Sequence, residues 1–135
     1  MARWTIGALV VLVVLFAAAW VAALQVTGPP VVCVINGSAH SLVNIVVTTS
    51  AGERSFGNLE PRARRCHIVE ADGGSGLAIS LSAVGQTVSA GALGYLENSG
   101  GFCEVVTVDV KLHISSSPRC PSLESLACRL TRGCS

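Results

Sequence analysis

Residues 31–50, VVCVINGSAHSLVNIVVTTS, decide the fold of this chain. Two runs rich in Val and Ile, Val31–Asn36 and Leu42–Thr49, flank the turn residues Gly37 and Ser38. β-Branched residues favour strands, and short clusters of Gly, Ser and Asn between such runs favour turns. This stretch therefore predicts two consecutive β-strands at the start of a sheet.

The same organisation continues outward along the chain. Five further strands are expected at Arg54–Leu59, Arg64–Glu70, Leu77–Ser82, Thr87–Gly94 and Phe102–Ile114. Turn-forming residues separate them at intervals of about ten residues, and no helical period appears. The pattern predicts an all-β domain over residues 31–114, an antiparallel Ig-like β-sandwich of about seven strands.

Alternation within each run predicts which side chains face the core. The expected inward residues are Val43, Ile45 and Val47, then Leu77, Ile79 and Leu81, then Val106, Val108, Val110, Leu112 and Ile114. Polar residues between them are expected to face water. In the fourth run, Cys66 and Ile68 share one face, and Arg65 and His67 share the other.

An apolar segment precedes the domain. Thr5–Leu24 carries no charge, and Arg3 is the only charged residue before Glu53. Twenty helical residues at 1.5 Å each can cross a hydrocarbon core of about 30 Å. We therefore expect residues 1–24 to form a signal anchor or signal peptide and residues 25–30 to form a linker. With Arg3 held inside, the domain faces away from the cytoplasm.

Two outcomes remain open for this segment. An uncleaved anchor gives a single-pass membrane protein, held through residues 5–24, with its domain in the periplasm or at the cell surface. Trp20 resembles an interfacial anchor, and the segment exceeds the usual length of a signal-peptide core. Cleavage near Ala23, after Val21-Ala22-Ala23, would instead release a secreted domain.

Six cysteines indicate disulfides in an exported chain. They are Cys33, Cys66, Cys103, Cys120, Cys128 and Cys134, and six cysteines allow 15 connectivities. Cys33 and Cys66 lie on expected strands, where they either bridge, if those strands are neighbours, or remain buried thiols. Cys103 shares a face with polar residues, so we expect it near the surface and within reach of the tail.

Residues 115–135 form a cysteine-containing tail with a short helix beginning near Pro121. Its expected apolar face comprises Leu123, Leu126, Ala127 and Leu130, and Gly133 follows as a stop signal. A helix this short is not stable alone in water. It must therefore dock on the sheet, be clipped by cysteines, contact a partner or membrane, or stay loose.

The sequence contains no catalytic constellation. It has no Gly-x-Ser-x-Gly elbow, no paired carboxylates, no Cys-x-x-Cys pair, and no zinc-ligand spacing. We therefore expect no enzymatic activity, no cofactor and no metal. A net charge of +1 and three aromatic residues beyond the apolar segment argue against nucleic-acid binding.

Two polar features remain as candidate sites. Arg62, Arg64 and Arg65 form a basic cluster that either contacts an anion or partner or is a solvated face. Asn36-Gly37-Ser38 fits the glycosylation sequon, which matters only in a eukaryotic secretory pathway.

The stretches VCVINGSAHSLVNIVV, FGNLEP and GYLENSGG resemble small exported bacterial sandwich domains of Ig-like or prealbumin-like type. The matching positions within about residues 31–114 are Asn36, Ser38, Leu42, Asn44, Ile45, Gly57, Leu59, Pro61, Gly94 and Tyr95. Arg62 departs from that pattern, which favours Gly after Pro, so the turn there is expected to differ in type. The resemblance implies a fold and no activity.

These observations predict a membrane-anchored extracytoplasmic β-sandwich that acts as a non-enzymatic structural or protein-interaction module. A protein partner is expected at a sheet edge, where a strand can be added. The alternative is a secreted, disulfide-containing redox or small-ligand-binding protein. The ligand class is not indicated by the sequence.

Overall fold

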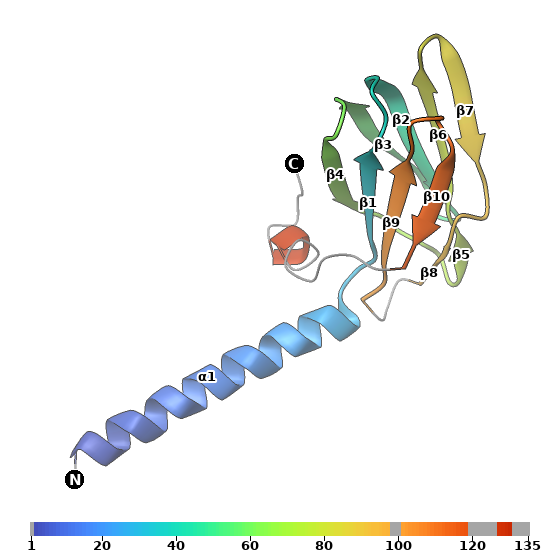
Figure 1. Ribbon diagram of the computed structural model, residues 1–135. Helices are drawn as coiled ribbons and strands as arrows, with labels where there is room; N and C mark the ends of the chain where they lie inside the picture. Colours follow the sequence, from blue (N-terminus) through green and yellow to red (C-terminus); the bar gives the residue numbers. More distant parts are fainter. Residues whose placement is uncertain (1, 98–100, 119–126, 131–135) are drawn as a thin grey trace.

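The computed structural model describes residues 2–97, 101–118 and 127–130. Within them, helix α1 (Ala2–Thr27) precedes ten strands, and Figure 1 shows this helix extending away from the β-domain. One four-stranded sheet has the order β10 (Ile114–Ser117), β9 (Cys103–Val108), β1 (Val31–Asn36), β4 (Arg64–Ile68). The second has the order β3 (Gly52–Leu59), β2 (Leu42–Thr49), β6 (Ala78–Ala83), β7 (Gln86–Ala90). A small third sheet pairs β5 (Ser75–Gly76) with β8 (Tyr95–Leu96).

The β-rich class of the domain is confirmed, but the described residues form ten strands in three sheets rather than about seven in two. The pairing is also not antiparallel throughout, because β1 pairs with β9 in parallel. Strands joined by a tight hairpin must be antiparallel, whereas strands far apart in sequence are free of that constraint. β1 and β9 belong to the second case.

The expected last strand, Phe102–Ile114, is divided by a turn into β9 and β10. The carboxylate of Asp109 accepts hydrogen bonds from the backbone N–H groups of Lys111 (2.8 Å) and His113 (2.9 Å). Leu112 has a positive φ of 61°, and Val110 is 71% exposed. Val110 and Leu112 therefore lie in the turn. The predicted inward place of Val110 is wrong, whereas Leu112 is half-buried and packs against the core.

A bulge in β2 corrects a second prediction about inward residues. Asn44 has a φ of 54°, its backbone N–H donates to the Asn58 side chain, and the β2–β3 register shifts here. Leu42 and Ile45 are buried, whereas Val43 is only half-buried. One extra residue exchanges the two faces of a strand, so Val43 does not share the inner face with Ile45.

The two four-stranded sheets pack face to face around one hydrophobic core. The first sheet supplies Val32, Val34, Val106, Val108 and Ile114, and the second supplies Leu42, Ile45, Val47, Phe56, Leu59, Ile79 and Leu81. The expected inward set Leu77, Ile79 and Leu81 is fully buried. Alternation therefore predicts the core correctly wherever the strand is regular.

A second apolar cluster lies on the outer face of the first sheet. Val31, Cys33, Val105 and Cys128 are buried in it, and Ile35, Cys66, Ile68 and Cys103 pack against them. The run VVCVI is apolar at every position because β1 is covered on both faces, as in buried strands generally. Cys128 belongs to the tail, so this cluster is where the tail docks.

Only Ala127–Leu130 of the expected tail helix is described, and this segment is helical. Cys128 and Arg129 are buried, whereas Ala127 is exposed and Leu130 is 59% exposed. Contact with the outer cluster through Cys128 sets the rotation of this turn, so the predicted apolar face is wrong for Ala127 and Leu130. Leu123 and Leu126 lie outside the described residues.

Helix α1 is long and apolar enough to be a membrane span or a signal peptide. Its candidate span, Ile6–Ala23, is not buried anywhere against the domain. The helix continues through Thr27 into residues expected to be linker, and it ends before Gly28-Pro29-Pro30 because proline cannot continue a helix. The connection to β1 is therefore shorter than predicted.

Asn36 at the end of β1 links two loops. Its side chain is fully buried, and its amide nitrogen donates to the carbonyl oxygens of His40 (2.8 Å), Leu59 (3.0 Å) and Glu60 (3.0 Å). Its amide oxygen accepts from the backbone N–H and the hydroxyl of Ser38. This buried position does not suit a glycosylation acceptor, so the sequon residues have a structural role.

We expect Asn36→Ala to destabilise the domain by about 3 kcal/mol, because it leaves several buried polar groups without their partner. The matched control, Asn58→Ala, removes an exposed side chain with one hydrogen bond and should cost less than about 1 kcal/mol. Urea unfolding of the full chain in detergent, followed by circular dichroism, measures both. Equal losses for the two variants would contradict the role assigned to Asn36.

Candidate functional site

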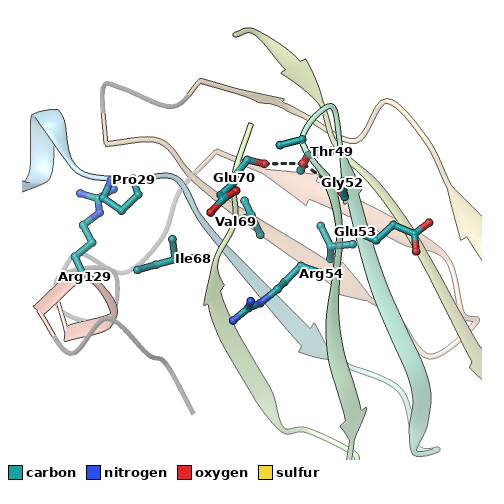
Figure 2. A pocket seen from close by; sticks show the side chains of 11 residues that line it. Pro29, Thr49, Gly52, Glu53, Arg54, Ile68, Val69, Glu70 and Arg129 are labelled. Carbon is teal, nitrogen blue, oxygen red and sulfur yellow. Dashed lines mark hydrogen bonds between the residues drawn. The ribbon is translucent and has the colours of Figure 1, made fainter. Parts of the chain in front are cut away.

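A cavity of about 680 Å³ opens beside the linker that follows α1 (Figure 2). Its walls come from the β2–β3 turn, the end of β4, the linker and the tail helix. The lining residues are Pro29, Val47, Thr49, Ala51, Gly52, Glu53, Arg54, Ile68, Val69, Glu70 and Arg129. The volume lies within the range of small-molecule sites.

Local hydrogen bonds hold one wall of this cavity in place. The Thr49 hydroxyl bonds to the carbonyl oxygens of Glu70 (2.6 Å) and Gly52 (3.3 Å), as the dashed lines in Figure 2 show. Gly52 has a φ of 133°, which only glycine adopts readily. The β2–β3 turn is thereby tied to the segment leaving β4, so the two sheets are joined at this end.

Four charged residues line the cavity. In Figure 2, Glu53 is directed away from the other charged groups, whereas Arg54 extends from β3 and Glu70 from the segment that follows β4. Arg129 is 8% exposed, lies beside Pro29 and donates to the Phe102 carbonyl oxygen at 3.5 Å. Burial lowers the pKa of Arg129, but a guanidinium remains charged at neutral pH. The cavity therefore presents two cations and one facing carboxylate.

His67 on β4 lies within the electrostatic influence of two arginines, Arg54 and Arg65. Partial burial lowers its pKa, and the charges of Arg54 and Arg65 lower it further. The imidazole is therefore neutral at pH 7 and packs edge-on against Phe56, with ring centroids 4.8 Å apart. His67 contributes packing rather than charge.

The predicted basic cluster of Arg62, Arg64 and Arg65 does not line the cavity. Arg65 is half-buried, and its guanidinium donates to the Phe56 carbonyl oxygen at 2.6 Å, so it links β4 to β3. Arg64 is exposed on β4. Arg62 is exposed with a φ of 61°, the conformation that glycine favours after Pro61. Arg62 therefore adopts the left-handed conformation although it is not glycine.

Disulfides cross-link strands of the first sheet and constrain the tail. Cys33 and Cys66 face each other in the β1–β4 register and form a disulfide, with Cα atoms 4.0 Å apart. Cys103 and Cys128 each take part in a disulfide as well, and no described cysteine is free. Cys120 and Cys134 lie outside the described residues. Of the two alternatives left open for Cys33 and Cys66, the structure has the bridge.

Glu104 is a buried acid that the sequence analysis did not single out. It is 4% exposed on β9, and burial raises its pKa while a hydrogen bond with Ser116 opposes that rise. The Glu104 carboxyl group lies close to the Gly94 backbone, since a Cβ atom at Gly94 would lie 2.7 Å from the carboxyl carbon. Glu104 follows the same alternation as Val106, which is the signal that marks it as inward.

We expect Glu104→Gln to stabilise the domain at pH 7. Because the folded pKa of Glu104 is raised above the unfolded value of 4.5, its contribution to stability is fully present below pH 4.5 and is lost as pH rises through the folded pKa. Thermal unfolding between pH 3 and 8 should show this slope in wild type and lose it in the variant. Glu53→Gln, at an exposed position, is the control and should keep the slope. A wild-type slope retained in Glu104→Gln would refute the assignment.

Among the described residues, no group of three or more His, Cys, Asp or Glu side chains could hold a metal ion. No family model and no curated protein matches the sequence. The structure is similar to an NMR structure of a protein from Eubacterium rectale, with 14% sequence identity and a TM-score of 0.49. The similarity covers 72% of this chain and 91% of the other. Neither fold nor function follows from a likeness at this level.

Proposed function

We propose that this chain is a membrane-tethered, extracytoplasmic interaction or structural module without enzymatic activity, built on an Ig-like or prealbumin-like sandwich. The observation that carries the proposal is the short path from α1 to the domain. The apolar helix ends at Thr27, and Gly28, Pro29 and Pro30 alone precede β1. Pro30 and Gly28 are buried, so the linker is packed against the domain.

Oxidised cysteines support an extracytoplasmic domain. The Cys33–Cys66 bridge and the disulfide-bonded Cys103 and Cys128 would be reduced in most cytosols but persist in oxidising compartments. This agrees with the orientation that Arg3 favours. A redox function is less well supported, because Cys33 is only 2% exposed and thiol exchange requires access to a sulfur.

The four edge strands differ in charge, and this difference favours one docking side. β3 carries Glu53 and Arg54, and β4 carries Arg64 and Arg65. β7 (QTVSA) and β10 (ISSS) carry no charged residue. Charged side chains on an edge discourage strand addition. We infer that an extended segment of a partner protein adds to the uncharged edge at β7, the longer of the two strands.

The β6–β7 hairpin defines which backbone groups of β7 are available. The two-residue loop Val84-Gly85, with both φ values positive, places Ala83 opposite Gln86. Residues flanking such a loop exchange hydrogen bonds, and alternate residues point outward. The backbone groups of Thr87 and Ser89 therefore face away from β6 and are placed to bind an added strand.

The tether is tested by the mass of the protein purified from membranes, alkylated without prior reduction. We expect the full-length mass, retention in the membrane after carbonate extraction, and no alkylated cysteine. A mass lacking residues 1–23 would contradict the tether and indicate a secreted domain released by signal cleavage. Alkylated cysteines in the folded protein would instead support the redox alternative.

The docking edge is tested by photo-crosslinking in cells from a benzoylphenylalanine placed at residue 89. We expect a discrete adduct from Ser89 and none from the matched exposed position Ser55 on β3. Thr87→Lys puts a charge on the edge and should reduce the Ser89 adduct at least fivefold. Equal adducts from both positions, or an adduct indifferent to Thr87→Lys, would argue against docking at β7.

A further inference from the structure

Two exposed valines occupy turns at the end of the sandwich opposite the linker. Val84 begins the loop of the β6–β7 hairpin and is 65% exposed, and Val110 is 71% exposed in the β9–β10 turn. β9 runs parallel to β1 and ends beside Asn36, the last residue of β1. β6 ends next to the start of β2, which places the hairpin loop at the same end (Figure 1). We call these two turns the distal tips.

Valine is a costly residue at the first of these turns. Val84 and Gly85 have φ values of 52° and 74°, and a two-residue loop of this kind favours Asn or Asp before Gly. A β-branched residue rarely adopts a positive φ, because its side chain crowds the backbone. Packing returns little of this cost, since most of the Val84 side chain faces water. Backbone strain at an exposed apolar residue is typical of a contact surface rather than of a structural position.

The β9–β10 turn holds Val110 on a rigid frame. The Asp109 carboxylate accepts two backbone N–H groups within the turn. Backbone hydrogen bonds also join Asp109 to Leu112 and to His113, each at 3.0 Å, and Leu112 packs against the core. A side chain presented on an ordered turn loses little conformational entropy when a partner covers it. Val110 is therefore placed as a preorganised apolar contact.

Two exposed cations accompany the distal tips. Lys111 follows Val110, and Arg62 lies in the β3–β4 turn. The backbone N–H of Arg62 donates to the carbonyl oxygen of Asn36 at the end of β1. Because β1 lies between β4 and β9, two strand spacings, or roughly 10 Å, separate the β3–β4 and β9–β10 turns. One partner surface can therefore contact both cations and Val110.

Charge is divided between the two ends of the sandwich. At the distal end, four cations outnumber two carboxylates: Arg62, Arg64, Arg65 and Lys111 against Glu60 and Asp109. Both carboxylates accept hydrogen bonds within the domain, Glu60 from Ser41 and Asp109 from its own turn. The other carboxylates of the described residues lie toward the linker: Glu53, Glu70, Asp72, Glu97 and Glu104. The distal end is therefore complementary to an acidic surface.

The distal end also faces away from the membrane in which α1 is proposed to lie, so this step rests on the proposed tether. β1 leaves the linker and runs for six residues, about 20 Å at 3.3 Å each, before it reaches the distal tips. Headgroups of the tethering membrane lie at the other end of that strand. A basic surface with exposed apolar side chains at this distance suits a protein rather than a lipid partner.

We propose that the distal tips bind an acidic segment of a partner protein, which covers Val84 and Val110 with apolar side chains and pairs its carboxylates with Lys111 and Arg62. The contact is distinct from strand addition at β7, because it uses the side chains of turns rather than the backbone of an edge strand. Val84 and Val110 belong to different sheets, so one partner segment would bridge the two layers of the sandwich.

A library of random peptides displayed on phage, selected against the full chain in detergent, supplies the probe. We expect the enriched peptides to combine carboxylates with large apolar residues. Fluorescence anisotropy of the most enriched peptide then measures its affinity for each variant. Enrichment of peptides without carboxylates, or of none, would overturn the proposed partner chemistry.

Substitutions at the distal tips should weaken binding of this peptide. We expect a loss of at least fivefold for Val110→Ser and of at least threefold for Lys111→Gln. The matched controls remove an exposed apolar side chain and an exposed guanidinium at the linker end, Leu130→Ser and Arg54→Gln, and should stay within twofold of wild type. Equal affinities for the distal variants and the controls would overturn the site.

Val84→Asn separates a binding role from a structural one. Asn suits the left-handed conformation, so the midpoint of thermal unfolding should rise by about 4 °C, while peptide affinity falls at least threefold. A variant that is stabilised without losing affinity, or that is destabilised, would refute the role of Val84 as a contact.

Two further measurements distinguish this site from the other proposals. Phosphatidylglycerol vesicles that bind the chain as tightly as the peptide, with the same dependence on Val110, would overturn the protein partner and assign the distal tips to a lipid surface. The Ser89 adduct in cells should be unchanged by Val110→Ser, because the β7 edge is a separate contact. Loss of that adduct in Val110→Ser would overturn the separation of the two sites, whereas an adduct absent from wild type would refute only the β7 edge.

Discussion

Strand β1 is enclosed on four sides, and the rest of the domain is arranged around that constraint. It is hydrogen-bonded to β4 along one edge and to β9 along the other. Val32 and Val34 enter the core between the sheets, while Val31 and Cys33 enter the cluster under the tail. A strand buried on both faces needs a cover on each, so the second sheet and the tail are both required.

That enclosure also explains how the chain passes from α1 into the domain. Because β1 is the first strand and is central, the chain enters the middle of the first sheet directly from α1. The end of the sandwich next to the linker is then occupied by the β2–β3 turn, the segment leaving β4 and the tail, and these enclose the charged cavity. The uncharged edge strand β7 contributes no residue to the cavity lining. The proposed protein-docking edge and the charged cavity therefore occupy separate surfaces.

Several of the polar and glycine positions singled out from the sequence have structural roles in this molecule. Asn36 and Ser38 bond to each other and join the β1–β2 loop to the end of β3. Asn44 forms the bulge in β2, and Gly57 opposite Ile45 has a φ of 69°. Gly94 leaves room for Glu104. A pattern of this kind describes backbone requirements, which is why it implies a fold without implying an activity.

Sequence alone determined the apolar helix, the bounds of β1 and β2 and the inward set around Ile79, because hydrophobic length and alternation are local properties. It did not determine the division of the last expected strand, since the Asp109 carboxylate reverses a chain whose Val and Leu residues continue the strand pattern. The parallel β1–β9 pairing and the Cys33–Cys66 bridge depend on which strands become neighbours, which is a property of topology. The cavity could not be predicted from the sequence either. Its lining residues Arg54, Glu70 and Arg129 are far apart in sequence and share a cavity only because the edge strand β3, the segment after β4 and the tail lie together in the fold.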